Sequence, residues 1–143
     1  MSLRITAVDL ENAAISATWL DLLDHYARDP MGGGVGLSAY ARTHLVDELK
    51  RLPTFNGALA WRGEKAVGLI NCFAGFSTFA AKPLLNIHDI VVHADARRQG
   101  IGHFGNHTGG HFGFLMMGFD FLIHQRLDFK GIEIATHHNA QVI

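Results

Sequence analysis

Residues 84–92 read LLNIHDIVV, and this apolar run most constrains what the chain can fold into. Its apolar side chains would occupy both faces of a strand, which is typical of a strand at the centre of a sheet. After HADA at 93–96 comes RRQGIG at 97–102. A buried strand that runs into a glycine-containing turn and then a helix predicts an α/β fold around a mixed sheet.

Two helices are predicted upstream, after a first strand at residues 3–8. Asp9 is expected to cap the first helix, because apolar residues recur every three or four positions after it. The segment RDPMGGGVG at 28–36 ends that helix with one proline and four glycines. Ser38 is expected to cap a second helix, which Pro53 stops.

Three strands follow the helices. GALAWRGEKAVGLINCF at 57–73 predicts a hairpin whose turn is residues 62–65. AGFSTFAAKP at 74–83 is predicted to be a loop or a short irregular segment, and the strand at 84–92 comes next. The expected order is therefore strand, helix, helix, strand, strand, strand and the glycine turn.

Composition narrows the class of protein. A length of 143 residues suits about one domain. The formal net charge of -1 gives no indication of a nucleic-acid partner. The single cysteine, Cys72, cannot form a disulfide within the chain, which favours a reducing, cytoplasmic setting. No stretch approaches the ~18 apolar residues of a membrane span, so no membrane is expected.

The glycine turn has a specific chemistry. Backbone N–H groups at the start of a helix, together with the helix dipole, form a cradle for anions. Gly100 and Gly102 let a diphosphate approach the backbone without a Cβ in the way. Arg97 and Arg98 can add positive charge at the rim. The alternative interpretation is a tight turn whose arginines are solvated, and it would be preferred if the motif stood alone. The apolar strand that ends in IVV just before the motif favours the anion cradle instead.

Residues 1–102 resemble the GNAT superfamily of acetyl-CoA-dependent N-acetyltransferases, on the pattern [RQ]-x-x-G-x-[GA] after a strand that ends in a valine pair. The resemblance implies a twisted mixed sheet in which acetyl-CoA lies in a split between the fourth and fifth strands. Backbone groups near the valines would pair with the pantetheine arm, and the N–H groups of 98–103 would hold the pyrophosphate. The implied cofactor-binding residues are Val91, Val92, Arg97, Arg98, Gln99, Gly100, Ile101, Gly102 and His103.

An amine must lose a proton before it attacks a thioester, so a base is needed. His88 and Asp89 are the candidates, and alternation along a strand would point them to opposite faces. The alternatives are a histidine packed on the sheet and a buried acceptor for backbone N–H groups. Asn71, Phe73 and Phe76, with Phe79 beyond them, could form an acceptor pocket; core packing is the alternative for the aromatic residues.

The segment 103–143 departs from the family. It contains four glycines between residues 105 and 113, where the family has an amphipathic helix, and six of the ten histidines. A shifted reading frame, a truncated family member and a tail selected for another role all fit. No tyrosine follows the motif to act as the acid. His103, His107 and His111 have the spacing of one helix face, with His137 and His138 beyond, but the partners of a metal signature are missing and no metal is expected.

Two functions therefore remain open. The first is direct transfer of acetyl from acetyl-CoA to an amine of a small molecule or peptide. The alternative is a catalytically impaired remnant that binds coenzyme A or only associates with a partner chain. Either way, residues 1–143 are expected to form one GNAT-like domain with an atypical tail. An incomplete sheet leaves an edge that recruits partners, so a homodimer is expected.

Overall fold

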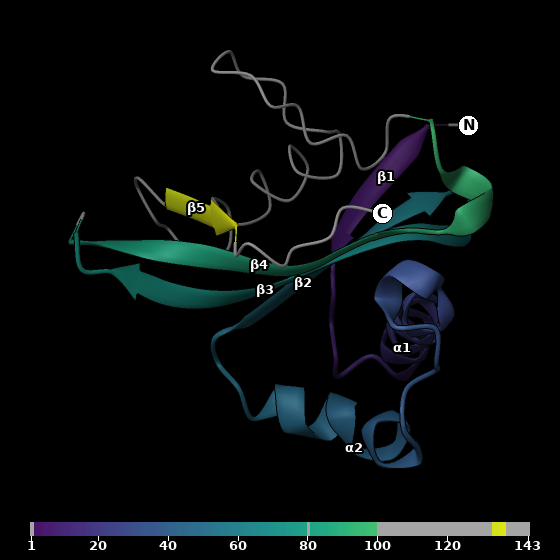
Figure 1. The fold of residues 1–143 in the computed structure, drawn as a ribbon, viewed down its shortest axis with the longest axis horizontal. Helices are drawn as coiled ribbons and strands as arrows, with labels where there is room; N and C mark the ends of the chain where they lie inside the picture. The colour runs from purple at the N-terminus through teal and green to yellow at the C-terminus, as the bar shows by residue number, and fades with distance from the viewer. Residues whose placement is uncertain (1, 80, 100–132, 137–143) are drawn as a thin grey trace.

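The computed structural model describes residues 2–79, 81–99 and 133–136, and the elements alternate much as the sequence indicates (Figure 1). Their bounds are β1 (Leu3–Ala7), α1 (Ala13–Arg28), the one-turn 3-10 helix η1 (Pro30–Gly32), α2 (Ala39–Lys50), β2 (Phe55–Arg62), β3 (Lys65–Ser77), β4 (Lys82–Val92), the one-turn 3-10 helix η2 (Ala94–Ala96) and β5 (Glu133–Thr136).

The described strands form one mixed sheet in the order β1-β2-β3-β4-β5. The first four strands pair antiparallel, and β4 pairs parallel with β5. The predicted α/β fold class, with a mixed twisted sheet flanked by helices, is confirmed. β4 has a neighbour on each side, as expected for its apolar sequence, although β5 pairs only with its first half, from Leu84 to Ile87.

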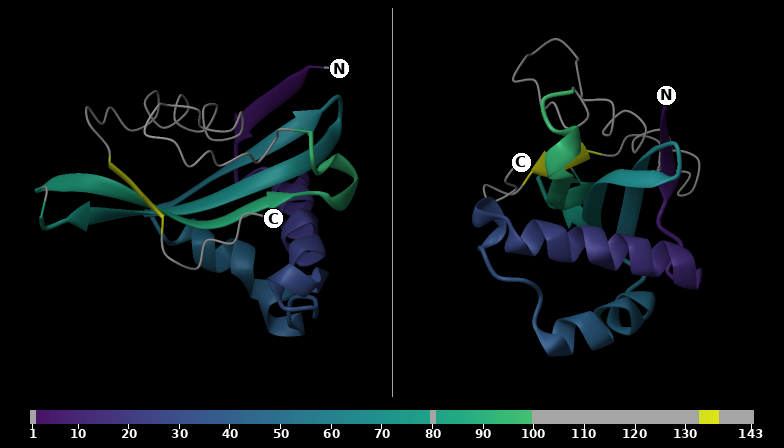
Figure 2. Two further views of the ribbon diagram at one scale, coloured as in Figure 1. Left: turned by 45° about the horizontal axis from the view of Figure 1, so that its top comes forward. Right: turned by 90° about the vertical axis from the view of Figure 1, so that its right-hand side faces the viewer.

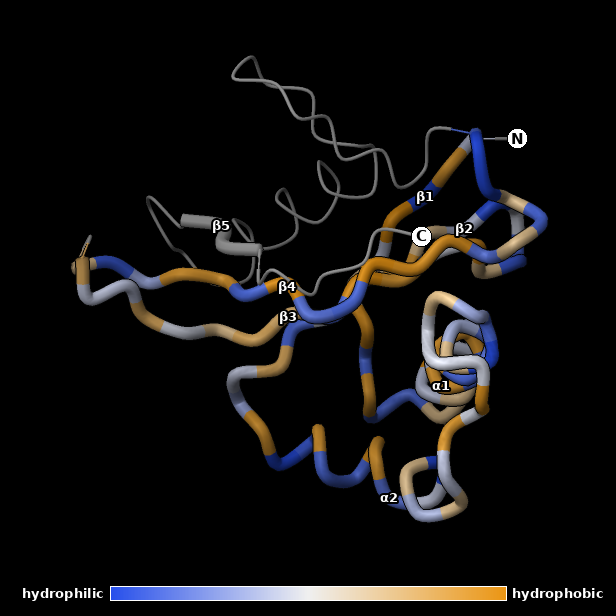
Figure 3. The backbone as a smooth tube through the Cα atoms, in the orientation of Figure 1, coloured by the Kyte–Doolittle hydropathy of each residue, from blue (hydrophilic) through white to orange (hydrophobic). Residues whose placement is uncertain are grey.

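Both helices cover the same face of the sheet, as two views agree (Figures 1 and 2). On this helix-covered face, Trp19 of α1 is fully buried and packs with Leu59, Leu69 and Val91 of three adjacent strands. The other face carries a second buried cluster, which includes Ile70 and Cys72 of β3 and Ile87 and Ile90 of β4. Figure 3 shows the hydrophobic stretches of the central strands. The sheet is therefore buried on both faces, which is why its central strands read as apolar runs.

The start of α1 corrects one expectation. Asn12, not Asp9, is its N-cap, and its side-chain oxygen accepts hydrogen bonds from the N–H groups of Ala14 and Ile15 at 3.0 and 3.1 Å. Asp9 instead accepts a hydrogen bond from the N–H of Glu11 in the preceding turn. Both residue types cap helices well, so composition alone did not distinguish them.

The break between the helices and the second cap are as predicted. α1 ends at Arg28, and Gly33 and Gly34 adopt φ values of 118° and 77°, a region open to glycine. Ser38 caps α2 by accepting a hydrogen bond from the N–H of Ala41 at 3.1 Å.

The predicted loop at 74–83 is wrong. Residues 74–77 continue β3 and pair with residues 82–85 of β4, from Ala74 with Leu85 to Ser77 with Lys82. Only 78–81 remain for the connection, where Ala81 has a φ of 52°. Glycine and alanine weaken the strand signal in this segment, but pairing along the whole hairpin satisfies its backbone groups and decides the conformation.

Within the described residues, no helix is both long and apolar enough to cross a membrane.

Candidate active site

A β-bulge in β4 places the two candidate bases. Asn71 of β3 pairs with Asp89, but the next residue, Cys72, pairs with Ile87, so His88 is an extra residue on β4. An extra residue shifts the alternation of side chains by one. Ile87 and Ile90 accordingly lie in the same buried cluster although they are three positions apart, a spacing that places side chains on opposite faces of a regular strand.

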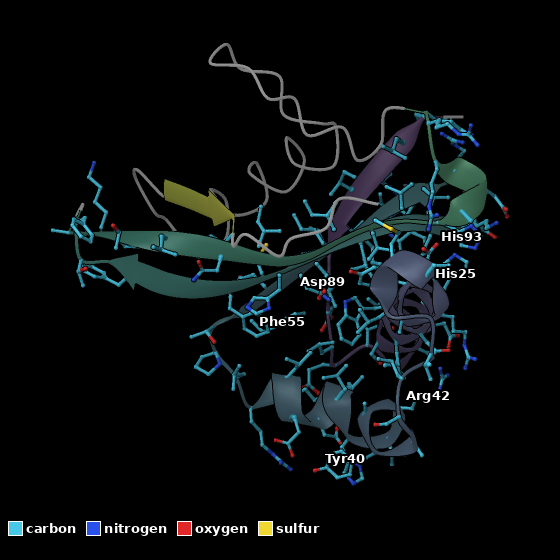
Figure 4. The ribbon with its side chains drawn as sticks, viewed as in Figure 1. His25, Tyr40, Arg42, Phe55, Asp89 and His93 are labelled. Carbon is cyan, nitrogen blue, oxygen red and sulfur yellow. The ribbon has the colours of Figure 1, made fainter. Side chains whose placement is uncertain are left out.

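His88 and Asp89 consequently face the same side of the sheet, and the prediction of opposite faces is wrong. The ring of His88 meets the ring of Phe73 edge-on, with centroids 4.8 Å apart and an interplanar angle of 79°. Phe73 in turn contacts Phe55 of the helix-covered face, and Asp89 lies on the side of α1 (Figure 4). The bulge thus places the imidazole of His88 and the carboxylate of Asp89 next to each other on the helix-covered face of the sheet.

Asp89 is held by a hydrogen-bonded chain that begins in the core. The indole N–H of Trp19 donates to Oδ1 of Asn71 at 2.8 Å, and Nδ2 of Asn71 donates to Oδ2 of Asp89 at 3.0 Å. Trp19 is fully buried and Asn71 is 3% exposed, so neither polar group has an aqueous alternative. Within the described part of the chain, the bond from Asn71 is the side-chain hydrogen bond that Asp89 accepts, and the Asp89 carboxylate is half-buried. Asn71 therefore positions Asp89. Both the oxygen and the nitrogen of its side-chain amide are already hydrogen-bonded within the protein.

The aromatic residues proposed for an acceptor pocket do not gather together. Phe73 is half-buried between Phe55 and His88. Phe76 is 61% exposed and pairs with Pro83, farther out along the hairpin, and in a regular strand it points to the face opposite Phe73. Phe79, at the hairpin tip, is fully exposed. Of the three, only Phe73 lies beside the candidate bases.

The second half of β4 has an open edge in the part of the chain that the structure describes. Pairing with β5 ends at Ile87, one residue before the bulge. The N–H of His93 donates to the carbonyl of Val67 at 2.9 Å, so the backbone groups of His93 point toward β3. Backbone groups of successive residues in a strand point to opposite sides, so those of Val91 also point toward β3, whereas those of Ile90 and Val92 point toward the open edge. Val91 therefore offers no backbone hydrogen bond at this edge. Ile90, which sequence reasoning missed, offers both its N–H and its carbonyl there, and Val92 offers its N–H, because its carbonyl already accepts a hydrogen bond from Nε of Arg97.

The two arginines after β4 have different surroundings. Arg97 donates from Nε to the carbonyl oxygen of Val92 at 3.0 Å and from Nη2 to Oδ2 of Asp29 at 2.6 Å. Arg98 has a φ of 61° and an exposed side chain, and it makes no hydrogen bond or ion pair among the described residues. Gln99 contacts the guanidinium of Arg62 and donates to the carbonyl of Asp95 at 3.3 Å.

The other predicted turn residues, Gly100, Ile101, Gly102 and His103, lie outside the described residues, as do His107, His111, His137 and His138. Within the described ranges, no cluster of three or more histidine, cysteine, aspartate or glutamate side chains could hold a metal ion. Burial raises the pKa of the Cys72 thiol well above its usual range, so this cysteine is a packing residue rather than a nucleophile.

A pair of histidines that sequence reasoning missed lies at the end of β4. The rings of His25 on α1 and His93 stack with centroids 4.2 Å apart and an interplanar angle of 8° (Figure 4). They line a surface cavity of about 300 Å³ together with Thr18, Asp21 and Lys65. Burial, followed by the charge of His25, lowers the pKa of His93. Sixty-eight residues separate the two histidines, so no sequence pattern joins them.

Tyr26 is a second residue that sequence reasoning set aside. It packs against the core on the helix-covered face, and burial followed by the negative charge of Asp89 raises the pKa of its phenol. The phenol therefore stays protonated at neutral pH near the candidate base.

The site thus combines a bulged strand, an open strand edge and a turn that begins with two arginines. The sequence matches the model of the Acetyltransferase (GNAT) family over residues 19–104. The chain belongs to the GNAT acetyltransferase family. The resemblance noted from the motif is thereby confirmed, and the chain is a GNAT-type N-acetyltransferase. No curated protein matches the sequence.

Solved structures of GNAT proteins share the fold. An aminoglycoside acetyltransferase from an uncultured soil metagenomic sample is 19% identical with a TM-score of 0.60, and the alignment covers 96% of this chain and 80% of that one. A ribosomal-protein-alanine N-acetyltransferase from Brucella melitensis biovar Abortus 2308 is 14% identical with a TM-score of 0.63, covering 96% and 82%. A possible acetyltransferase from Clostridium difficile 630 is 15% identical with a TM-score of 0.65, also covering 96% and 82%.

Proposed function

We propose that this GNAT chain transfers an acetyl group from acetyl-CoA directly to an amine of a small molecule or peptide. The observation that carries the proposal is the bulge at His88. At this one point β4 loses its parallel partner among the described residues, turns two titratable side chains to the same face, and continues toward the arginine-led turn. Transfer from a thioester to an amine requires a site that holds the two reacting groups close together and correctly oriented.

The acetyl-CoA site runs along the second half of β4 in this proposal. The N–H and carbonyl of Ile90 and the N–H of Val92 would pair with the amide-containing pantetheine arm, much as another strand would. The N–H groups of 98–103 would hold the pyrophosphate, and the exposed Arg98 would add charge at the rim. The free edge and the positions of residues 97–99 support this assignment.

The acid–base roles follow from the surroundings of the two candidates. An amine arrives as an ammonium ion, and the carboxylate of Asp89, held by Asn71, attracts that charge. The exposed imidazole of His88 accepts the proton, directly or through water. The amine nitrogen then forms a bond to the thioester carbon, the carbon–sulfur bond breaks, and the thiolate leaves with its electron pair. The acetylated nitrogen loses its remaining extra proton, which the thiolate takes up, directly or through water, to become the thiol of coenzyme A.

The acceptor class is supported by the proteins that share the fold. Two of them are named for aminoglycosides and for ribosomal-protein alanine, and both kinds of acceptor carry an amine. A carboxylate beside an exposed imidazole suits a cationic amine of either kind.

A second candidate function is coenzyme A binding without efficient turnover. Two sequence observations favour it: no tyrosine follows Gly102, and four glycines fall between residues 105 and 113. Each glycine costs about 1 kcal/mol in a helix interior relative to alanine, which weakens the helix that would aim the phosphate-binding N–H groups. Loss of proton transfer to the thiolate would remove roughly 100- to 10,000-fold in rate.

We further propose that residues 1–143 form a single domain, that the chain works in the cytoplasm without a metal, and that two copies associate. β1 lies at one end of the strand order of the described residues, and its unpaired outer edge supports association, because unpaired strand edges recruit partners.

Thiol release from acetyl-CoA with a panel of amines tests the proposal, after calorimetric titration has measured binding. The wild type should bind acetyl-CoA and release thiol, and His88→Ala should lower kcat by about 100-fold or more. His44→Ala is the matched control, since His44 is an exposed histidine on α2 that stacks on Tyr40. Binding without thiol release for any amine would support the second function, and no binding would overturn both.

A further inference from the structure

We propose that Arg97 is a positioning residue which clips the start of the phosphate-binding turn to the end of α1, and that it does not itself bind the pyrophosphate. The inference rests on the proposed function and changes the role expected for the first arginine of the motif. It assigns the rim charge to Arg98 alone.

The contacts of Arg97 join the end of β4, five positions before it, to the end of α1, 68 positions before it. Nε donates to the carbonyl of Val92, the last residue of β4, and Nη2 donates to the carboxylate of Asp29, which follows α1. The Arg97 and Asp29 side chains are 27% and 14% exposed, so the pair is shielded from most of the solvent. An ion pair in such a place is stronger than one on the open surface.

Asp29 is fixed on its other side. Its Oδ1 accepts a hydrogen bond from the N–H of Met31 at 3.0 Å and so caps η1, while its backbone N–H donates to the carbonyl of Tyr26. The hydrogen bond from Arg97 is the main cause that lowers the pKa of Asp29, so the carboxylate is charged at neutral pH. A carboxylate held at both oxygens is a rigid anchor for the guanidinium.

The geometry needs an arginine. A guanidinium presents donors in a planar fork, so Nε and Nη2 can reach two fixed acceptors at once, whereas a lysine ammonium is a single point on a flexible stem. A guanidinium paired with a carboxylate has its charge compensated already, and it has little to gain from a phosphate unless the pair breaks. Arg98 lacks such a partner in the described part of the chain, and its side chain is exposed.

The clip fixes the direction in which the chain leaves β4. Between Val92 and Arg97 the backbone makes the single turn of η2, whose backbone hydrogen bonds run from the N–H of Ala96 to the carbonyl of His93 at 2.8 Å and from the N–H of Arg97 to the carbonyl of Ala94 at 3.3 Å. So short an element holds its own orientation weakly. The side-chain contacts of Arg97 supply the missing restraint, and misdirection of the following N–H groups would cost affinity for the diphosphate.

Substitution of Asp29 decides between the two roles, because they predict opposite signs. Asp29→Ser keeps a side-chain oxygen that can cap Met31 but is too short to reach Arg97. If Arg97 positions the turn, Asp29→Ser and Arg97→Ala should each raise the Kd for acetyl-CoA about tenfold, and the double variant should be no worse than either single variant. If Arg97 binds the pyrophosphate, removing its competing carboxylate should leave the Kd unchanged or lower it.

The readout is calorimetric titration with acetyl-CoA and, in parallel, with S-acetylpantetheine, which lacks the diphosphate. The clip variants should lose affinity for the first and keep affinity for the second, and in turnover their KM for acetyl-CoA should rise while kcat stays near that of the wild type. The matched control is Glu48→Ser with Arg51→Ala, an exposed arginine–glutamate pair at the C-terminal end of α2 with N···O 3.2 Å; this variant should bind as the wild type does.

The outcomes separate the two proposals. No binding of acetyl-CoA by the wild type overturns the proposed function and the clip with it. Wild-type binding with equal or tighter binding by Asp29→Ser overturns the clip alone. Equal losses for both ligands also overturn it, because they would show general damage to the fold.

Discussion

Asn71→Leu tests whether the buried hydrogen-bonded chain under β4 holds the site together. The substitution removes an amide that serves two partners and replaces it with an apolar side chain of similar volume. It leaves the indole N–H of the fully buried Trp19 without its 2.8 Å acceptor and Asp89 without its 3.0 Å donor.

The cost can be estimated from these contacts. An orphaned buried donor costs about 1–3 kcal/mol, and a hydrogen bond to a charged group contributes about 1.5–3 kcal/mol. Asp89 is only half-buried, and the leucine gains some apolar burial, so both terms are reduced. We expect the free energy of unfolding to fall by about 2–3 kcal/mol and, at about 2–4 °C per kcal/mol, Tm to fall by about 4–12 °C.

Urea and thermal denaturation followed by circular dichroism measure the effect. Trp19→Phe should also destabilise, and the double variant should lose less than the sum of the single variants, because donor and acceptor then leave together; a coupling of about 1 kcal/mol is expected. Asn86→Leu on β4 is the control: this half-buried amide makes no hydrogen bond among the described residues, and its loss should stay within about 0.5 kcal/mol. Strict additivity, or an effect of Asn71→Leu no larger than the control, would refute the reasoning.

Three further predictions concern other parts of the chain. Gly102→Asp should abolish most of the heat of acetyl-CoA binding in a calorimetric titration, because a carboxylate would lie where the pyrophosphate is expected; unchanged affinity would move the site elsewhere. Gly57→Ala should destabilise by about 1–3 kcal/mol in urea, because its Cβ would lie 3.0 Å from Cγ2 of Val8 in the core; an unchanged midpoint would show that Val8 can yield. His93 has a lowered pKa, so as pH falls through about 6.5 the unfolded chain binds a proton first and stability declines toward the lower folded pKa. His93→Gln should flatten that decline between pH 7.5 and 5, and urea midpoints that change equally in both proteins would contradict it.

Local elements were predictable where the signal lies within a few residues. Ser38 was identified as a cap because serine before an apolar-periodic stretch satisfies orphan N–H groups of the first turn. The turn at 62–65 was identified from its polar residues and Gly63, whose φ is 60°. Asp9 and Asn12 show the limit of such reasoning, because both residue types can cap a helix. Which of them is the cap depends on where the first turn of the helix begins, and in this chain it begins after Asn12.

The β-bulge was not predictable. LLNIHDIVV reads as a regular strand, and alternation along it separates His88 from Asp89. The extra residue exists because β3 pairs with β4 on both sides of it, and the register on each side brings apolar residues to the core. Residues 74–77 of β3, which were predicted to be a loop, were missed for a similar reason. Their strand conformation depends on pairing with β4 more than on their own composition.

The sequence by itself determined the fold class, the order of the elements and the family, because hydrophobic periodicity, helix breakers and the R-x-x-G-x-G pattern are local properties of the chain. Only the tertiary structure decided how the chemistry is arranged: that His88 and Asp89 share a face, that Trp19 holds Asn71, and that Arg97 is bound to Asp29. The physical reason is distance along the chain. These contacts join residues from 18 to 68 positions apart, and which donor meets which acceptor depends on the register and packing of the whole sheet.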